Sequence, residues 1–287
     1  MATIITNYLR PPKAPNLAVA TTEYEQRYQD QLNNQLRIYF NELDNAMQTL
    51  LGSGAGGGKF IRFPYGAFQD TAYTTLNGAI NNSVTTITVV STTGFPTSGQ
   101  IRIDAEVIIY TGTTATTFTG CTRGARGTAN SAHSTGATVT KIQAPAASTA
   151  TVMSMNTTDY ANDMSLVDTS KMTVTSSGIY NLQWSGQFNN SDTSLHDISV
   201  WIRVDGVDIP GSTGFASIPN SHGGIDGHAL VGWNYFVSLE ASQYVELWWS
   251  STNQSITLEC YAPQTSPTRP STASVIATLS FVSALPT

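Results

Sequence analysis

The sequence predicts a mainly β protein that is preceded by an extended N-terminal segment and one long helix. Only 11% of the 287 residues are Asp, Glu, Lys or Arg, and Thr, Ser, Gly and Asn are frequent in the second half of the chain. This composition suits many short strands and turns. A single stretch has helical periodicity, and from residue 60 onward short alternating or β-branched runs are separated by turn residues.

The charge and the hydrophobic pattern exclude several kinds of partner. A net charge of −6 gives no clustered Lys and Arg for a phosphate backbone, so we expect no nucleic acid partner. No run reaches the length of a membrane span and no secretory signal is present, so we expect no membrane insertion and assembly in the cytoplasm. Cys121 and Cys260 match no metal-ligand spacing, and we expect two reduced, packed thiols.

Residues 1–21 predict an extended segment that orders against a partner protein. Pro11, Pro12 and Pro15 exclude a regular helix in this segment. Its apolar residues argue against the alternative, a solvated tail. The candidate docking residues are Ile4, Ile5, Tyr8, Leu9, Arg10, Pro11 and Pro12.

Residues 22–51 predict a helix that begins with a capping box of Thr22 and Glu25. Its apolar residues recur at steps of three or four and form one stripe. The stripe consists of Tyr24, Tyr28, Leu32, Leu36, Tyr39, Leu43, Met47 and Leu50. Because a Gly-rich linker at 52–59 follows, we expect the stripe to pack against copies of itself as a stalk. A different protein, or the β region of the same chain, is the alternative cover.

Strands are expected where alternating or β-branched runs are bounded by turn residues. They are expected at 84–90, 101–110, 137–142, 172–175, 179–188, 198–204, 230–239, 244–250, 255–261 and 274–282. The dipeptide Asp205-Gly206 predicts a hairpin turn after the strand at 198–204.

Two of these strands predict how their faces are used. Tyr180, Leu182 and Trp184 share one face of the strand at 179–188, and we expect that face to be buried. In the strand at 244–250, a second face carries Tyr244 and Trp248 around Glu246. A monomer would expose these aromatic side chains, so we expect a subunit interface to cover them.

Residues 77–143 read as a small β module inserted into a larger one. They contain the bend TGFPTSG at 93–99, the run IDAEVIIYTG at 103–112, and the segments CTRGARGT at 121–128 and AHSTGATV at 132–139. In this order the motifs resemble a small β module that recurs in phage virion proteins. The resemblance implies a component of a phage particle and leaves the role of the module open.

The segments on either side of this module, residues 60–76 and 144–287, carry a second resemblance. The motifs are FPYGAFQDT at 63–71, YANDMSL at 160–166, SGIYNLQWSGQF at 177–188, VWIRVDG at 200–206, WNYFV at 233–237, YVELWWS at 244–250 and PSTASV at 270–275. They resemble the trimeric jelly roll of the tumour-necrosis-factor and complement-head type, as used in bacteriophage (cyanophage-like) fibre and spike proteins. The resemblance implies a homotrimer with a jelly-roll β-sandwich head, a coiled-coil stalk and a virion anchor at the N-terminus.

Side chains that could carry catalysis are sparse. No Ser, His and Asp arrangement has the context of an activated nucleophile, and no phosphate-binding loop is present. Two Asp pairs, Asp192 with Asp197 and Asp205 with Asp208, qualify for glycan hydrolysis only by residue type, because both lie in turn-like sequence. We therefore expect no catalytic residues.

Loops at the ends of the predicted sandwich are the expected place for binding, at 189–196, 211–228 and 264–269. A metal site formed by the His residues of the second loop is the alternative, but a Gly-rich loop seldom preorganises ligands. We expect no metal and no cofactor. The candidate receptor-contacting residues are Asn190, Asp192, His196, His222, Asp226 and His228.

These features together predict a virion structural protein and not an enzyme. We expect a trimeric fibre or spike, assembled in the host cytoplasm and anchored to a tail or capsid through its N-terminus. Its β heads would adhere to a host-surface polysaccharide or protein, with avidity from three copies. The alternative is a purely architectural capsid decoration or tail-assembly fibre without a receptor. A glycan depolymerase is a third, less favoured hypothesis.

Overall fold

The computed structural model describes residues 17, 22–51 and 63–285 of the chain. The described residues contain one helix and 23 strands, which makes the protein mainly β as expected. The chain divides into two units, Met1–Phe63 and Pro64–Thr287, and each is described by itself.

The helix α1 (Gln26–Leu51) begins four residues later than the capping box predicted. Thr22 lies in a bend, and the backbone carbonyl of Glu25 accepts the first helical hydrogen bonds from the amides of Tyr28 and Gln29, both at 3.1 Å. Tyr24 therefore precedes the helix, where it is 84% exposed, and does not belong to the stripe. The prediction of a Thr22 cap was wrong because the chain enters the helix through the Glu25 carbonyl instead.

The apolar stripe of α1 is partly exposed in the first unit taken by itself. Leu32, Leu36 and Leu43 are half-buried, and Met47 is 45% exposed. No residue of α1 belongs to any of the three hydrophobic clusters of the described residues. The side chain of Leu50 lies outside the described part, as does the whole predicted docking segment from Ile4 to Pro12.

The second unit is built on two large antiparallel sheets. The first sheet runs in the order β11 (Thr157–Asn162), β1 (Tyr65–Asp70), β23 (Val275–Ser283), β14 (Gly178–Asn190), β20 (Ile256–Glu259), β9 (Thr138–Gln143), β4 (Gly99–Ile103), β5 (Glu106–Tyr110) and β8 (Thr122–Ala125). Two further strands join it: β18 (Gly227–Leu239) pairs with β14, and β2 (Tyr73–Thr75) pairs with β9.

The second sheet runs in the order β12 (Met164–Val167), β13 (Lys171–Val174), β19 (Tyr244–Ser251), β15 (His196–Val204) and β16 (Val207–Asp208). It is extended by β10 (Thr151–Val152) beside β19 and by β17 (Gly214–Ile218) beside β15. The small elements are a sheet of β3 (Ile87–Thr88), β7 (Thr117–Thr119) and β6 (Gly112–Thr113), and a hairpin of β21 (Gln264–Thr265) and β22 (Thr268–Arg269).

A hydrophobic core between the two sheets makes the larger part of this unit a β-sandwich. The core takes side chains from both sheets, among them Leu182 and Leu279 of the first and Leu247 and Trp249 of the second. The predicted alternation in β14 is confirmed, because Tyr180, Leu182 and Trp184 all point into this core. The Asp205-Gly206 hairpin is also confirmed: Val204 pairs with Val207, and both turn residues have positive φ.

The second face of β19 differs from its prediction. Glu246 is buried and accepts a hydrogen bond from Ser170 at 2.6 Å, and the Arg203 guanidinium lies 3.8 Å from the centre of the Trp248 ring. Lys171 likewise lies over the Tyr244 ring, at 5.1 Å. Side chains of the same chain therefore cover this aromatic face, and it supplies no argument for a subunit interface.

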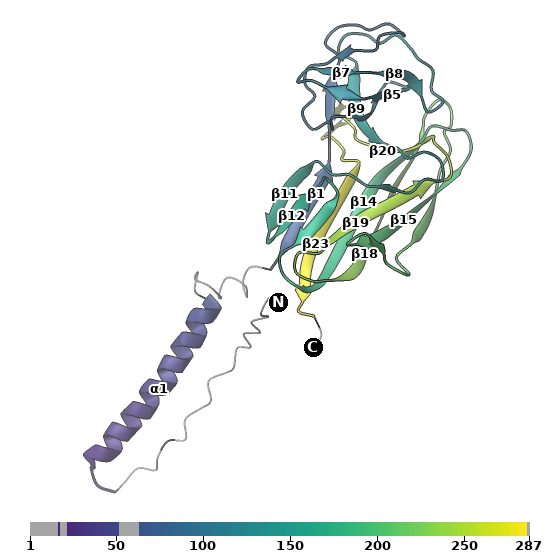
Figure 1. Cartoon of the computed structure of the whole chain (residues 1–287). Helices are drawn as coiled ribbons and strands as arrows, with labels where there is room; N and C mark the ends of the chain where they lie inside the picture. Colours follow the sequence, from purple (N-terminus) through teal and green to yellow (C-terminus); the bar gives the residue numbers. More distant parts are fainter. Residues whose placement is uncertain (1–16, 18–21, 52–62, 286–287) are drawn as a thin grey trace. The chain divides into compact units, whose positions relative to one another are not determined.

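Residues 77–143 contribute a hydrophobic core of their own. Ile101, Ile103, Ile108 and Phe118 belong to this second cluster, which also takes Leu76 from the preceding segment and shares no residue with the core of the sandwich. The expected strand at 101–110 is two strands, because Asp104, with φ of 51°, begins a tight turn between β4 and β5. The expected strand at 84–90 is reduced to β3, with a single bridge at Val89. Figure 1 shows β5, β7, β8 and β9 together at one end of the unit.

A continuous sheet and a buried ion pair join residues 77–143 to the sandwich. β9 pairs with β20, and the Lys141 ammonium lies 2.5 Å from Asp70, whose side chain is fully buried. The other Asp70 oxygen accepts hydrogen bonds from Gln143 at 2.8 Å and Ser274 at 2.6 Å. Cys260 lies beside this cluster, and both cysteines are buried free thiols, as expected. The joint is therefore rigid, and it fixes the surfaces on either side of it.

Candidate functional site

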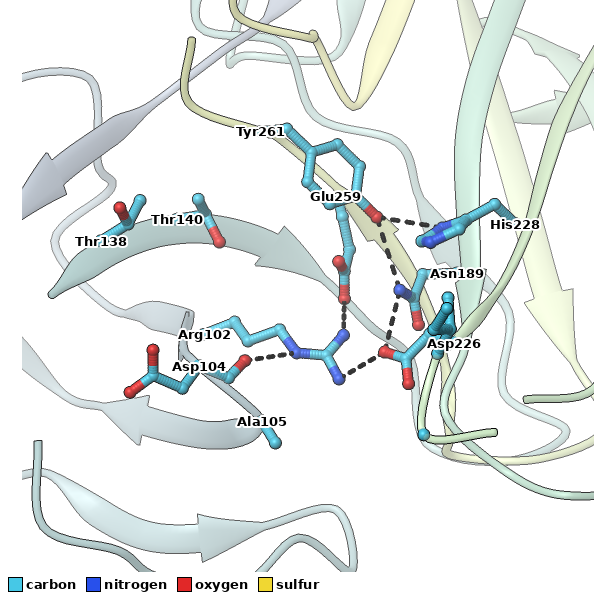
Figure 2. A pocket seen from close by; sticks show the side chains of 12 residues that line it. Arg102, Asp104, Ala105, Thr138, Thr140, Asn189, Asp226, His228, Glu259 and Tyr261 are labelled. Atoms are coloured by element: carbon cyan, nitrogen blue, oxygen red, sulfur yellow. Dashed lines mark hydrogen bonds and ion pairs between the residues drawn. The ribbon is translucent and has the colours of Figure 1, made fainter. Parts of the chain in front are cut away.

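Two polar cavities lie where residues 77–143 meet the sandwich, and together they form what we call the junction groove. The first has a volume of about 520 Å³ and the second of about 570 Å³. Both are lined by Arg102, Ala105 and Asp226, so these residues form the partition between them. Figure 2 shows the first cavity, with Arg102 reaching across from β4 toward the loop before β18.

Arg102 is the centre of the polar network in the groove. Its side chain is mostly buried and contacts Glu259 at 2.5 Å and Asp226 at 2.7 Å. Its Nε donates to the backbone carbonyl of Asp104 at 3.2 Å, which is part of the β4–β5 turn. The pKa of Arg102 is raised, because the attraction of the two carboxylates outweighs desolvation by burial, which acts in the opposite direction. One guanidinium thus connects three segments that are distant in the sequence.

Asn189, at the end of β14, lies behind Asp226. It is only 2% exposed, and its amide nitrogen lies 3.1 Å from Asp226 and 3.4 Å from the hydroxyl of Tyr261. Its Oδ1 is buried and has no hydrogen-bond donor among the described residues. The Tyr261 hydroxyl also contacts Nδ1 of His228 at 3.3 Å, and the two rings meet edge to face.

The tyrosine in this network remains a phenol at neutral pH. Burial raises the pKa of Tyr261, and the Glu259 carboxylate acts in the same direction. Glu259 is nearly fully buried and also accepts a hydrogen bond from the Thr257 hydroxyl at 2.7 Å. Tyr261 is therefore a neutral hydrogen-bonding group with an apolar ring, set in the wall of the first cavity.

The second cavity continues the groove on the other side of the Arg102–Asp226 pair. Arg126 lies in its wall, and its guanidinium donates to the side chain of Gln100 and to the carbonyl of Pro145, each at 2.5 Å. Asp192 lies in the opposite wall and contacts His196 at 2.8 Å. The hydrogen bond from His196 lowers the pKa of Asp192.

The predicted receptor residues are only partly brought together. Asp226 and His228 line the first cavity, and Asp192 lines the second. His196 holds Asp192, whereas His222 is exposed at a tight turn where its backbone pairs with Ile225. These positions do not test whether the loop residues bind a receptor, so that function stays a prediction.

The remaining predicted receptor residue is not available at the surface. Asn190 is fully buried, and its amide donates to the carbonyls of Ser194 and Ile218. Its backbone belongs to β14, so the expected loop at 189–196 begins two residues later than predicted. Asn190 therefore stabilises the conformation of the loop through buried hydrogen bonds and does not face a receptor.

The carboxylate pairs considered for hydrolysis are engaged in local structure. Asp205 occupies the β15–β16 turn and accepts a hydrogen bond from the Tyr244 amide at 3.1 Å. Asp208 lies beside the Arg203 guanidinium, and Asp197 accepts from the Ser217 hydroxyl at 2.5 Å. Among the described residues, no group of three or more His, Cys, Asp or Glu side chains is arranged to hold a metal ion.

The sequence interpretation did not identify Arg102, Glu259 and Tyr261 as site residues. A signal was present for two of them. Glu259 stands inside the apolar run at 255–261, and Arg102 stands between two isoleucines of a strand. A charged residue in a strand that is otherwise buried needs a partner. Identifying that partner required the fold, because β4 and β20 are far apart in the sequence.

Comparisons with known proteins assign no family to the chain. No protein-family model matches it. A search of curated proteins also finds no match. The described part of the chain has no helix that is both long and apolar enough to cross a membrane.

Proposed function

We propose that this chain is a non-enzymatic structural protein of a bacteriophage particle, a homotrimeric fibre or spike that adheres to the host surface. Residues 1–21 dock into the tail or capsid, the helical segment forms the stalk, and the β unit is the head. The observation that carries the proposal is the apolar stripe of α1, with Leu32, Leu36 and Leu43 on one face and none of them in a hydrophobic cluster of the described residues. A helix of this length buries such a stripe against other helices, and two further copies of α1 are the simplest cover.

The strand order supports a jelly-roll head. The strands of eight or more residues alternate between the two sheets: β14 lies in the first, β15 in the second, β18 in the first, β19 in the second and β23 in the first. β1 and β23, the first and last strands of the unit, are neighbours in one sheet. Two sheets connected in this way are typical of jelly rolls.

The outer face of the first sheet supports contact between heads. Leu230 and Phe236 of β18 are 72% and 57% exposed, and Ile276 of β23 is 46% exposed. Asn181 of β14 lies directly beside Phe236, and its buried Oδ1 has no donor among the described residues. A face that combines exposed apolar side chains with an unsatisfied amide suits a protein interface.

The head has a place for adhesion at one end. β1 runs from Tyr65 to Asp70, which contacts Lys141 at the joint, and Figure 1 shows β5, β7, β8 and β9 of residues 77–143 at one end of the unit. We assign adhesion to this end, beside which the junction groove lies. Adhesion by three such heads would gain strength from effective concentration.

The particle itself tests this proposal. Mass spectrometry and electron microscopy of purified particles of the encoding phage should find the chain in tail or capsid fibres, and the soluble chain should compete with particles for host cells. Absence of the chain from purified particles would refute the proposal. Presence in the particle without competition would support the architectural alternative, and new reducing ends in host polysaccharide would support the depolymerase alternative.

A further inference from the structure

We propose that the junction groove is a binding site for a neutral saccharide of the host surface, with one subsite on each side of the Arg102–Asp226 ion pair. This inference rests on the proposed adhesive function and names the ligand class and the site. It concerns the groove between residues 77–143 and the sandwich, and gives a purpose to the inserted segment.

The size and lining of the groove suit a ligand that has both polar and apolar surface. Each cavity falls within the range of about 300–1,000 Å³ that is usual for small-molecule sites. The first cavity is lined by hydroxyl, carboxylate, imidazole and amide groups, including those of Thr138, Thr140 and His228 (Figure 2), together with Ala105 and Ile225. Such a lining offers both donors and acceptors, which a polyhydroxylated ligand can use.

The charge of the first cavity disfavours an anionic ligand there. The carboxylates of Asp104, Asp226 and Glu259 line this cavity, together with the guanidinium of Arg102. That guanidinium is already engaged by two of the carboxylates. A phosphate or uronate in this cavity would therefore meet net negative charge. A neutral sugar has no such conflict, since its hydroxyl groups can donate to the carboxylates.

Tyr261 and His228 supply the ring surface that a sugar needs. They meet edge to face with ring centres 5.9 Å apart, and Tyr261 is held by the hydrogen bonds described above. The C–H face of a pyranose packs against such apolar surface while its hydroxyl groups reach the polar wall. His228 is exposed and Tyr261 is half-buried, so the rings are accessible from the groove.

The network is positioned before any ligand arrives. Arg102 is fixed by three acceptors that come from three segments, and Asn189 behind it is almost fully buried. Polar groups locked in this way bind with little loss of conformational freedom. The partition that they form separates two cavities of similar size, as expected for two successive sugar units on a chain.

Binding of the full-length chain to surface polysaccharide extracted from the host tests this inference. The polysaccharide is immobilised intact or after periodate oxidation, which destroys vicinal diols, and retention of the chain is measured. The groove variants are His228→Ala, which removes one ring, and Thr138→Trp, which fills the first cavity from an exposed position on β9. The matched control is Tyr160→Ala, which removes an exposed ring on β11 outside both cavities.

We expect the wild-type chain and Tyr160→Ala to bind the intact polysaccharide, and periodate to abolish binding. Each groove variant should lose at least about tenfold in affinity while keeping its melting temperature. Equal binding by all variants would overturn the groove as the site and leave adhesion standing. Binding to host cells without binding to polysaccharide would overturn the saccharide assignment. Binding to neither would overturn the inference together with the proposed adhesion.

Discussion

Glu106 is a buried carboxylate that depends entirely on its partners. Its two oxygens lie 2.8 and 2.7 Å from the guanidinium of Arg123, and one of them lies 2.7 Å from Nε2 of His133. The backbone amides of Gly124 and Ser131 also donate to it. The hydrogen bonds from Arg123 and His133 hold the pKa of Glu106 at about 2, against the opposing effect of burial.

This pKa predicts how the stability of the β unit depends on pH. The folded pKa of Glu106 is below its ordinary value near 4.5, so its contribution is fully present above pH 4.5 and is lost as the pH falls toward 2. We expect Glu106→Gln to lower the free energy of unfolding most at pH 7, with the difference from wild type shrinking between pH 4.5 and 2. Urea unfolding across this range measures it.

The control for that measurement is Glu240→Gln. Glu240 is exposed and accepts a hydrogen bond from Ser177, which a glutamine can also accept. We expect little change at pH 7. If Glu106→Gln lowers the free energy of unfolding by the same amount at pH 7 and pH 3, the contact with Arg123 does not stabilise the protein through the charged carboxylate.

Replacing Arg123, in the same cluster, is expected to lower the free energy of unfolding more than replacing Glu106. Its guanidinium also donates to the carbonyls of Asn81 and Ser131, each at 2.6 Å, so it connects β8 with two loops. Arg123→Ala leaves Glu106 buried without its cation, and we expect a loss of about 3–5 kcal/mol in the free energy of unfolding. Arg123→Lys, which keeps the charge but not the planar fork, should recover part of it. A loss below about 1 kcal/mol for Arg123→Ala, measured by urea unfolding, would contradict this account.

At the scale of elements, α1 carries the prediction about assembly. Replacing Leu32 and Leu36 by Asp places charges in the middle of the stripe, where packed helices would have to bury them. We expect the double variant to have the mass of a single chain and a weaker helical signal in circular dichroism, because an isolated helix is marginal in water. Asn33→Asp, on an exposed face, should keep the wild-type mass. An unchanged mass for the double variant would show that the stripe does not hold copies together.

Long strands were predictable and short ones were not, for a physical reason. In β14 one face lies on the core, so apolar residues alternate with polar ones and the period of two is visible in the sequence. β6 and β7 lie in a Thr-rich stretch at 111–119 where both faces carry similar side chains, so no alternation marks them. The face of β19 was misjudged because Arg203 and Lys171, which cover it, come from other strands.

At the scale of the whole molecule, the candidate site could be predicted only in part. Asp226 and His228 were accessible to sequence reasoning because they share one Gly-rich loop. Arg102, Asn189 and Glu259 come together only because β9 continues the sheet of the sandwich through β20. Long-range pairing of this kind leaves no local pattern in the sequence, so the contact of the inserted segment with the sandwich could not be predicted.

Association of three chains is the central claim of this account, since the stalk, the head contacts and the avidity all depend on it. Sedimentation equilibrium of the full-length chain at micromolar concentration measures it directly. We predict a single species with three times the 30.7 kDa mass of the chain. A stable species of 30.7 kDa under the same conditions would contradict the account.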